Sequence, residues 1–461
     1  MPARLPECWE VLYMGLSEYL DAVTDQIRCK RARLMIREEL ENHILEQAGA
    51  YEAEGRSSSD AREEAVRQMG DPVETGSALD RIHKPRLEWR LLLLVLLLSV
   101  AGLVVQYLAS GNISMVKFGY GDYFWKRQCV YLAIGLCIMF FVYLVDYTVL
   151  GRYPLLLWFG YFFLLVFLIV TGLVGNVAGK IRIFNYLTLF LPLYAGVIYH
   201  FRNKRYVGAG ICLLLSGMPV LLGFKTILIH GSAELSVCCL SLLLVAVWKG
   251  YFGGKKGWTT VGLIAVPVLC LVVLFFWGRS TGWLAGYQRM RLQAIFRPDL
   301  RSEYVDNYFL KAVRDCVSGM QMFGPALTSI PKEMAPLNTN YIIFFVFARY
   351  GIAAGVLMTV LLAAAVIKAF MVSWKLKNRL GFLVGMACSM VLAIQVAIYI
   401  PANFGVPLFE PMTIPFLSYG GQSTIVNCIL VGLVLGIYRN KDIVSEKDIK
   451  RGKWKIRLYR A

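Results

Sequence analysis

Long apolar runs repeat along most of this chain and constrain its fold more than any other feature. Each is about 20 residues long, which is enough for a helix to cross a hydrocarbon core about 30 Å thick. Of the 461 residues, 57% are hydrophobic and only 17% are charged, values far from those of a soluble protein. We count ten runs, near residues 90–109, 128–149, 154–175, 183–201, 207–224, 227–248, 258–278, 341–370, 380–402 and 423–438. The sequence therefore predicts an all-α polytopic membrane protein with about ten transmembrane helices.

Basic residues between the runs predict the orientation, because cytoplasmic loops retain Lys and Arg during insertion. Such residues fall on one face of the predicted core: Arg202, Lys204, Arg205, Lys249, Lys255, Lys256, Lys375, Lys377, Arg379, Arg439 and Lys441. An even number of spans puts both ends of the core on this face, so we expect cytoplasmic N- and C-termini. The net charge of +18 then reflects topology and attraction to anionic lipid headgroups, and it does not require nucleic acid.

Residues 1–85 have a different composition, rich in Glu, Arg and Gln, and we expect a small cytoplasmic helical prefix domain there. Asp60 and Glu63 are spaced as a capping box, and Gly70-Asp71-Pro72 is typical of a helix end. The pattern up to Pro72 resembles the permease prefix domain of some bacterial membrane proteins. No catalytic spacing occurs here, which leaves protein contact or stabilisation as roles. Residues 86–440 form the predicted membrane core, and residues 441–461 a basic cytoplasmic tail.

The segment from Pro415 to Ser423, called the signature segment below, cannot be the interior of a membrane helix. It reads Pro-Phe-Leu-Ser-Tyr-Gly-Gly-Gln-Ser. Two adjacent glycines each cost roughly 1 kcal/mol in a helix and free backbone groups that hydrocarbon cannot satisfy. We expect this segment to lie at the membrane interface or to line a polar cavity.

The longest outer loop, residues 279–340, carries cations where the charge rule disfavours them. Arg289, Arg291 and Arg297 are the central ones. Guanidinium groups bind phosphate oxygens through two parallel hydrogen bonds, so a pyrophosphate headgroup is a suitable ligand. The alternative is an ordinary solvated loop, because acids such as Asp299 and Glu303 could neutralise much of this charge.

In order and spacing, these segments resemble the SEDS family (shape, elongation, division and sporulation proteins, the FtsW/RodA/SpoVE group) over roughly residues 90–440. The signature segment carries the resemblance most specifically. Tyr287 to Leu292 resembles the family's Tyr-Gln-x-x-Arg segment, and Ala233-Glu234-Leu235 resembles its Pro-Asp-Leu-Gly element with Glu for Asp. Lys180 and Arg182 lie where the family has a basic segment, and Asn403 fits the pattern ahead of the signature.

The resemblance implies a bacterial plasma-membrane protein that binds lipid II, the undecaprenyl-pyrophosphate precursor of peptidoglycan, in cell division, cell shape or sporulation. Family members polymerise this precursor as glycosyltransferases, with a class B penicillin-binding protein as partner. The implied substrate-binding residues are Lys180, Arg182, Glu234, Arg289, Arg291, Arg297, Thr339, Asn403, Ser418, Tyr419, Gly420, Gly421 and Ser423. No His or Cys has metal-ligand spacing, so no cofactor is assigned, and a divalent cation at the pyrophosphate stays open.

The chain departs from the family where the chemistry is expected. The family has a Thr-Asp pair before the eighth span, whose carboxylate is thought to act in glycosyl transfer, whereas this chain has Thr339-Asn340. An amide cannot accept the proton of the acceptor hydroxyl. Glu333 is the best substitute base in the same loop, although an acid there is also typical of an ordinary surface. The family's Gln-Pro-Ser-Glu element is likewise replaced by residues 191–194, Leu-Pro-Leu-Tyr.

Three functions remain open from the sequence. The first is a glycosyltransferase that extends glycan strands from lipid II. The second is a catalytically impaired scaffold or regulator of wall synthesis that keeps the precursor site. The third is a transporter of a lipid-linked precursor, which broken helices at Pro192, Pro219 and Pro401 would suit.

Overall fold

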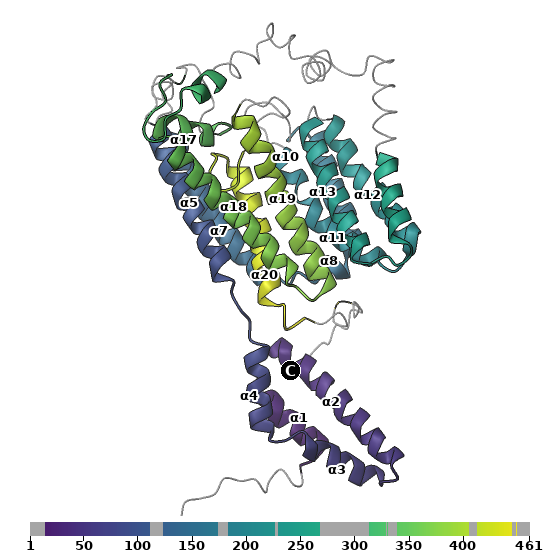
Figure 1. The fold of residues 1–461 in the computed structure, drawn as a ribbon. Helices are drawn as coiled ribbons and strands as arrows, with labels where there is room; N and C mark the ends of the chain where they lie inside the picture. The colour runs from purple at the N-terminus through teal and green to yellow at the C-terminus, as the bar shows by residue number, and fades with distance from the viewer. Residues whose placement is uncertain are drawn as a thin grey trace, which may run out of the picture. The chain divides into compact units, whose positions relative to one another are not determined.

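The computed structural model describes residues 14–110, 123–173, 183–225, 229–267, 313–328, 330, 339–404, 413–444 and 449. Across these residues the regular structure is helical, with no strand (Figure 1). The chain divides into two compact units, one of residues 1–87 with 439–461 and the other of residues 88–438. The larger unit contains the apolar runs and is called the core below.

The described residues of the smaller unit contain four helices: α1 (Leu16–Asp25), α2 (Lys30–Ala53), α3 (Ser58–Gln68) and α4 (Pro72–Ile82). The predicted capping box at Asp60 is wrong, because Ser57 is the N-cap of α3 and its Oγ accepts a hydrogen bond from Asp60 N (3.2 Å). Asp60 instead lies in the first turn. The helix ends before Gly70 as the sequence predicts, and a further helix that the sequence analysis did not predict begins there, with Asp71 as N-cap and Pro72 in the first turn. Tyr19, Leu20, Val23, Ile44, Ala48, Ala65 and Val66 form a buried core.

Residues after the last membrane helix fold back into this smaller unit. Ile443 is 1% exposed and packs with Ile27, Ala32 and Ile36 in a second buried cluster. The segments that flank the core in sequence therefore belong to one compact unit. That both ends of the core lie on the cytoplasmic side remains a prediction from the charge rule.

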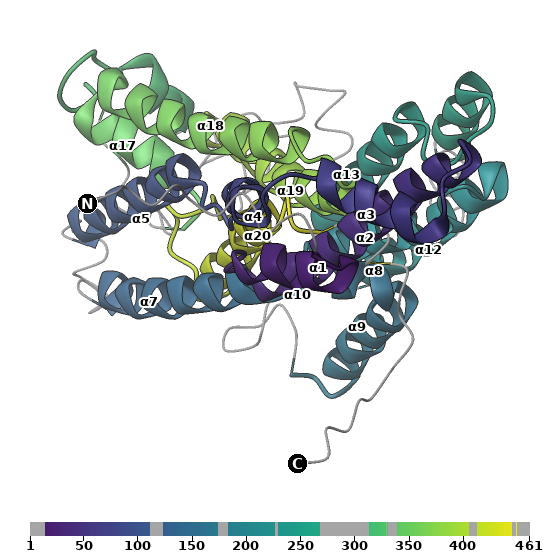
Figure 2. The same cartoon turned by 90° about the horizontal axis from the view of Figure 1, so that it is seen from below.

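The core consists of helices that run side by side (Figures 1 and 2). Their bounds are α5 (Trp89–Ser110), α7 (Tyr123–Leu144), α8 (Val149–Arg152), α9 (Pro154–Val170), α10 (Ile183–Leu187), α11 (Phe190–Phe201), α12 (Arg205–Lys225), α13 (Ile229–Trp248), α17 (Ile342–Tyr350), α18 (Ile352–Trp374), α19 (Arg379–Asn403) and α20 (Gly421–Arg439). Within the described ranges, six are long and apolar enough to cross a membrane: α5, α7, α12, α18, α19 and α20. Two shorter apolar helices, α9 and residues Glu234–Trp248 of α13, accompany them.

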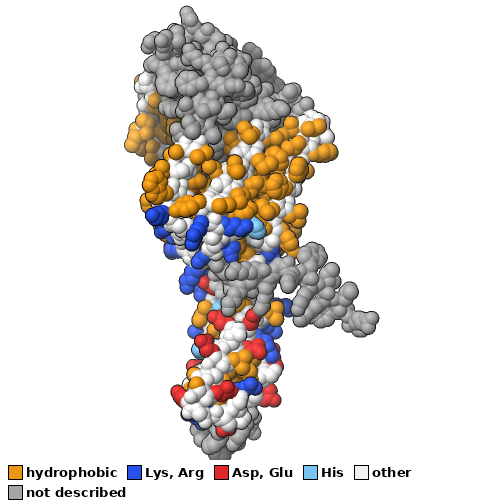
Figure 3. Space-filling view, turned by 90° about the vertical axis from the view of Figure 1, so that its right-hand side faces the viewer, with side chains coloured by type: hydrophobic (Ala, Val, Ile, Leu, Met, Phe, Trp, Pro, Cys, Tyr) orange, Lys and Arg blue, Asp and Glu red, His pale blue; other side chains and the backbone are white. Residues whose placement is uncertain are grey.

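Apolar and basic side chains occupy separate zones of the core surface. In Figure 3 hydrophobic side chains form a band across the coloured part of the core, with Lys and Arg gathered beneath it. At this basic end, Lys249 Nζ lies over the rings of Trp374 (4.5 Å) and Phe382 (5.0 Å), and Arg379 lies over Tyr251. The basic ends of α13, α18 and α19 therefore meet at one end of the core. The opposite end, which carries the signature segment, is called the signature end below.

Two predicted spans are interrupted. The run at 183–201 divides into α10 and α11, and the run at 341–370 divides at Gly351 into α17 and α18. Gly351 has φ +96°, and a Cβ there would lie 2.7 Å from the Met322 carbonyl oxygen, so both its conformation and its surroundings require glycine. By contrast, α12 and α19 continue through Pro219 and Pro401, which removes two of the three expected breaks.

Packing of α5 against the signature segment depends on another glycine. A Cβ on Gly102 would overlap the carbonyl group of Phe416, so the backbones of the two segments are in direct contact. Phe416 itself adopts φ +63°, which is uncommon for a side chain of this size. The signature segment is thus held in a fixed backbone conformation against α5.

Replacing Gly102 by Ala should lower the midpoint of thermal unfolding of the purified protein, because overpacking of this kind costs about 1–3 kcal/mol. The matched control is Gly210→Ala in α12, where a Cβ would meet no atom within 4 Å. We expect the control to unfold at the wild-type temperature. Equal midpoints for the two variants would contradict the close approach of α5 to Phe416.

Candidate functional site

Ser418 connects the signature segment to the residues that precede α17. Its side chain is 3% exposed, and its Oγ donates a hydrogen bond to Thr339 O (2.5 Å) while accepting one from Ile414 N (3.0 Å). A hydroxyl can donate and accept at the same time, so this one group joins two loops that are 79 residues apart in sequence. The structure therefore brings Thr339 and Asn340 next to the signature segment.

The first turn of α17 is held by α19. Asn403 is 0% exposed; its Oδ1 accepts from Phe344 N (3.1 Å), and its Nδ2 donates to Asn340 O (3.0 Å) and Tyr399 O (3.1 Å). The Tyr399 hydroxyl accepts from Ile342 N (3.0 Å). These contacts satisfy amide groups that a helix N-terminus leaves without intrahelical partners. These hydrogen bonds fix the backbone at Asn340, which is itself half-buried.

Two glutamines that our sequence reasoning missed complete the polar network. Gln128 of α7 donates from Nε2 to Thr424 Oγ1 (3.0 Å), and its Oε1 accepts from Gly420 N (3.1 Å). Gln106 of α5 donates to Leu417 O (3.0 Å). Both are at most 4% exposed. The sequence signal that could have identified them was a polar side chain inside an apolar run, because such groups in membrane helices face polar partners.

Aromatic rings surround the Tyr419 side chain at the outer surface of this network. Its ring centroid lies 4.9 Å from that of Phe124 in an edge-to-face arrangement and 6.2 Å from that of Tyr131. Burial raises the pKa of the Tyr419 phenol, with Tyr131 acting in the same direction and Arg127 opposing it. Arg127 is exposed and lies 4.5 Å over the Tyr123 ring. An accessible guanidinium is therefore positioned beside the signature segment, and the sequence analysis did not identify it.

Carboxylates are scarce in the described part of the core. Only Glu88, Asp146, Glu234 and Asp315 occur there, and none lies in the segments that form the polar network. Glu88 begins the core and pairs with Lys368 (2.6 Å). Glu234 of α13 is 5% exposed, and its Oε1 has no hydrogen-bond partner among the described residues. The network around Asn340 is thus made of amides, hydroxyls and backbone groups.

At the place of the family's Gln-Pro-Ser-Glu element, the chain is packed as an apolar interior. Leu191 and Tyr194 of α11 are both 0% exposed, and the Tyr194 hydroxyl donates to Cys212 O (3.0 Å). This element therefore offers no free polar group to a substrate in this conformation.

Six of the predicted site residues lie outside the described residues, namely Lys180, Arg182, Arg289, Arg291, Arg297 and Glu333. Of the others, hydrogen bonds bring Thr339, Asn340, Asn403 and Ser418 together, and Gly420 bonds to Gln128. Gly421 begins α20, and Ser423 accepts a hydrogen bond from Asn427 (3.2 Å). Within the described ranges no group of His, Cys, Asp and Glu could hold a metal ion.

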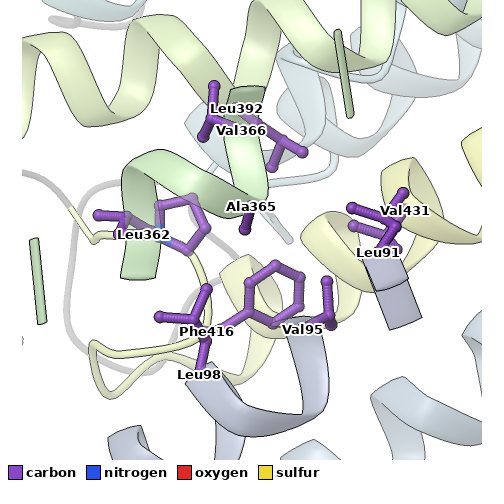
Figure 4. A pocket seen from close by; sticks show the side chains of 10 residues that line it. Leu91, Val95, Leu98, Leu362, Ala365, Val366, Leu392, Phe416 and Val431 are labelled. Carbon is purple, nitrogen blue, oxygen red and sulfur yellow. The ribbon is translucent and has the colours of Figure 1, made fainter. Parts of the chain in front are cut away.

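The opposite side of the signature segment is apolar. Phe416 reaches a small cavity of about 10 Å³ that is lined also by residues of α5, α18, α19 and α20 (Figure 4). Its lining includes Leu98, Leu362 and Leu392. A space of this size holds about one water molecule and no lipid chain. Polar chemistry is therefore confined to the side of the segment that carries Ser418 and Tyr419.

These features define a class: a polytopic α-helical membrane protein whose glycine-rich signature segment and interrupted helix form a polar site at one end of the core. Comparison with known proteins identifies the family. The chain belongs to the FtsW/RodA/SpoVE family of cell cycle proteins, whose model matches residues 88–443. The predicted membership and helical membrane fold are confirmed.

The relatives and solved structures described next each match about three quarters of this chain. The chain is 23% identical over 364 residues to a probable peptidoglycan glycosyltransferase FtsW of Geobacter sp. (strain M18), covering 75% of this chain and 95% of the relative. It is 25% identical over 374 residues to stage V sporulation protein E of Bacillus subtilis (strain 168), covering 76% and 96%. A chain of a peptidoglycan synthase complex has the same fold, with a TM-score of 0.60, 19% identity and coverage of 77% and 98%. RodA of Thermus thermophilus gives a TM-score of 0.51, 17% identity and coverage of 77% and 97%.

Replacing Asn403 by Ala should destabilise the start of α17, because each buried backbone group left without a partner costs about 1–3 kcal/mol. We expect a lower midpoint of thermal unfolding and faster hydrogen exchange at residues 342–345. As a control, Asn42→Ala removes an exposed amide whose Nδ2 bonds only to Glu38 O of its own helix, and it should leave both quantities unchanged. Unaltered exchange at residues 342–345 in Asn403→Ala would show that another contact holds this turn.

Proposed function

We propose that this protein binds lipid II, or a related undecaprenyl-pyrophosphate precursor, at the signature end of the core and acts in bacterial cell-wall synthesis without efficient glycan polymerisation. The observation that carries the proposal is the frame around Asn340. Ser418, Asn403 and Tyr399 hold the residues around it, while Asn340 itself supplies an amide where the family has a carboxylate. A site with this arrangement of amide and hydroxyl groups supports binding of the precursor better than it supports glycosyl transfer.

The chemical argument concerns the proton of the acceptor hydroxyl. Joining two sugars requires a base to take this proton as the pyrophosphate leaves, and a positioned base contributes about 10²- to 10⁴-fold to the rate. The Asn340 amide donates and accepts hydrogen bonds but does not take up the proton. The amide is therefore able to form a hydrogen bond with a sugar hydroxyl or a phosphate oxygen. Glu333 stays the proposed substitute if the chain retains polymerase activity.

The pyrophosphate requires cations at the same end of the core. Among the described residues, Arg127 is exposed beside Tyr419 and suits a phosphate oxygen. Lys180, Arg182, Arg289, Arg291 and Arg297 remain proposed contacts. A divalent cation that accompanies the pyrophosphate also remains a proposal, as does the binding role of Glu234.

The proposed setting is the bacterial plasma membrane, with both ends of the chain cytoplasmic and the signature end facing outward. The proposed partner is a class B penicillin-binding protein, and the likeness to a chain of a peptidoglycan synthase complex supports such an assembly. In that setting the protein serves as a scaffold or regulator that presents the precursor to partner enzymes.

Purified protein mixed with lipid II should give little or no glycan polymer, and Asn340→Asp should raise polymer yield about ten-fold or more because it restores a base. Gel separation of labelled glycan strands measures the yield. Asn340→Ala is the control, since it alters the same position without adding a base and should give no increase.

Robust polymer from the unmodified chain would contradict the proposed lack of catalysis. In that case Glu333→Gln would decide whether Glu333 supplies the base. Failure of Asn340→Asp to raise polymer yield, with lipid II binding intact, would show that restoring the carboxylate is not sufficient.

Replacing Arg127 by Ala should weaken lipid II binding, because a charge-assisted contact with phosphate would be lost; we expect roughly a ten-fold rise in Kd, which corresponds to about 1.4 kcal/mol. Binding of fluorescent lipid II to protein in nanodiscs measures it. The matched control is Arg152→Ala, which removes an exposed arginine from α8. Equal affinity of both variants would exclude Arg127 as a pyrophosphate contact.

A further inference from the structure

A short turn of residues 321–327 closes the break between α17 and α18. Gly324 N donates to Tyr350 O (3.2 Å), and Ala326 N donates to Ala348 O (2.8 Å), which satisfies carbonyl groups at the end of α17. Ile352 N donates to Gln321 O (2.9 Å). The turn thus pairs with backbone groups that the broken helix would otherwise leave exposed.

The same turn presents large apolar side chains at its surface. Met322 is 60% exposed, Phe323 75% and Leu327 79%, and the sequence of the turn, Gln-Met-Phe-Gly-Pro-Ala-Leu, contains no charged residue. The backbone contacts keep these side chains exposed in a defined arrangement. The turn therefore combines paired backbone groups with an apolar surface, which are the two properties that a segment needs to lie in lipid.

The length of α18 indicates how deep the turn lies in the membrane. That helix has 23 residues and is about 34 Å long at 1.5 Å per residue, slightly more than a hydrocarbon core of about 30 Å. Met322 O accepts from Ala353 N (3.1 Å) in the first turn of α18, so the turn lies at the end of a helix that is long enough to reach the boundary between hydrocarbon and headgroups. Arg349, which is exposed, and Tyr350 lie at the same level and are typical of this boundary.

The first turns of α18 also expose apolar side chains. Val356, Leu357 and Val360 in its first turns are 47–62% exposed on a helix apolar enough to cross a membrane. The backbone of the turn is joined to this helix by hydrogen bonds and lies beside its first turns (Figure 1).

We propose that the 321–327 turn is a membrane anchor that inserts Met322, Phe323 and Leu327 into the lipid leaflet at the signature end of the core. It thereby fixes the depth of α17. Because α17 has only nine residues between this anchor and the Asn340 end, the anchor also sets the depth of the candidate site relative to the lipid headgroups. The proposal concerns phospholipid and does not depend on lipid II binding.

Photocrosslinking tests the proposal. The photoreactive residue p-benzoylphenylalanine replaces Phe323 in the full chain, which is reconstituted in phosphatidylethanolamine and phosphatidylglycerol vesicles containing an alkyne-tagged phospholipid. Position 357 on α18 is the lipid-facing control, and position 63, exposed in the smaller unit, is the control outside the core. Each variant is first checked for a monodisperse elution profile.

We expect a lipid adduct at position 323 of at least half the yield at 357 and at least ten-fold the yield at 63. A yield at 323 equal to that at 63 would overturn the proposal, because it would place the turn in water. The same experiment in cells distinguishes a protein partner: a protein adduct in place of the lipid adduct at 323 would also overturn it.

Discussion

The hydrogen bonds that Asn403 makes to the first turn of α17 are the contacts on which the candidate site depends. Asn403 lies on α19, is fully buried, and uses both ends of its amide. Where water does not compete for hydrogen bonds, a buried amide without a partner destabilises the fold. An amide with partners holds the neighbouring backbone in one geometry. Ser418 adds a second connection from the signature segment to Thr339 O. Together they position the loop before α17 with neutral groups only, so the backbone frame needs no charge.

A break in a membrane helix leaves backbone N–H and C=O groups without intrahelical partners. At α17 and α20 of this chain, side chains and backbone groups of neighbouring segments supply the missing hydrogen bonds. The start of α17 is satisfied by Tyr399 and Asn403, and its end by the 321–327 turn. The start of α20 receives Gln128 at Gly420 N. Irregular backbone at membrane depth is tolerated only where such partners exist. The residues before α17 and before α20 are thus joined at the signature end of the core, where they form the candidate site.

The sequence predicted the elements better than their contacts. Apolar run lengths locate the core helices, and the Gly420-Gly421 pair locates the boundary between the non-helical residues and α20. The run at 341–370 read as one span because Gly351 is a single residue in an apolar stretch, and its positive φ depends on the distant Met322 carbonyl. The Asp60 cap was wrong because Ser57, three residues earlier, offers the same kind of side-chain acceptor. Gln106 and Gln128 were overlooked because their partners are about 300 residues away in sequence.

The replacements in this chain remove charge from the interior of a membrane protein while keeping the frame that positions it. A carboxylate in such an interior is costly unless a function or a partner retains it. Tyr194 fills the place of the family's Glu with a fully buried ring, and Asn340 keeps the shape of Asp without its charge. The change at Tyr194 removes a charge from the buried interior, and both changes remove a carboxylate that could move a proton. Among the described residues, the network around Asn340 therefore contains no carboxylate that could serve as a base.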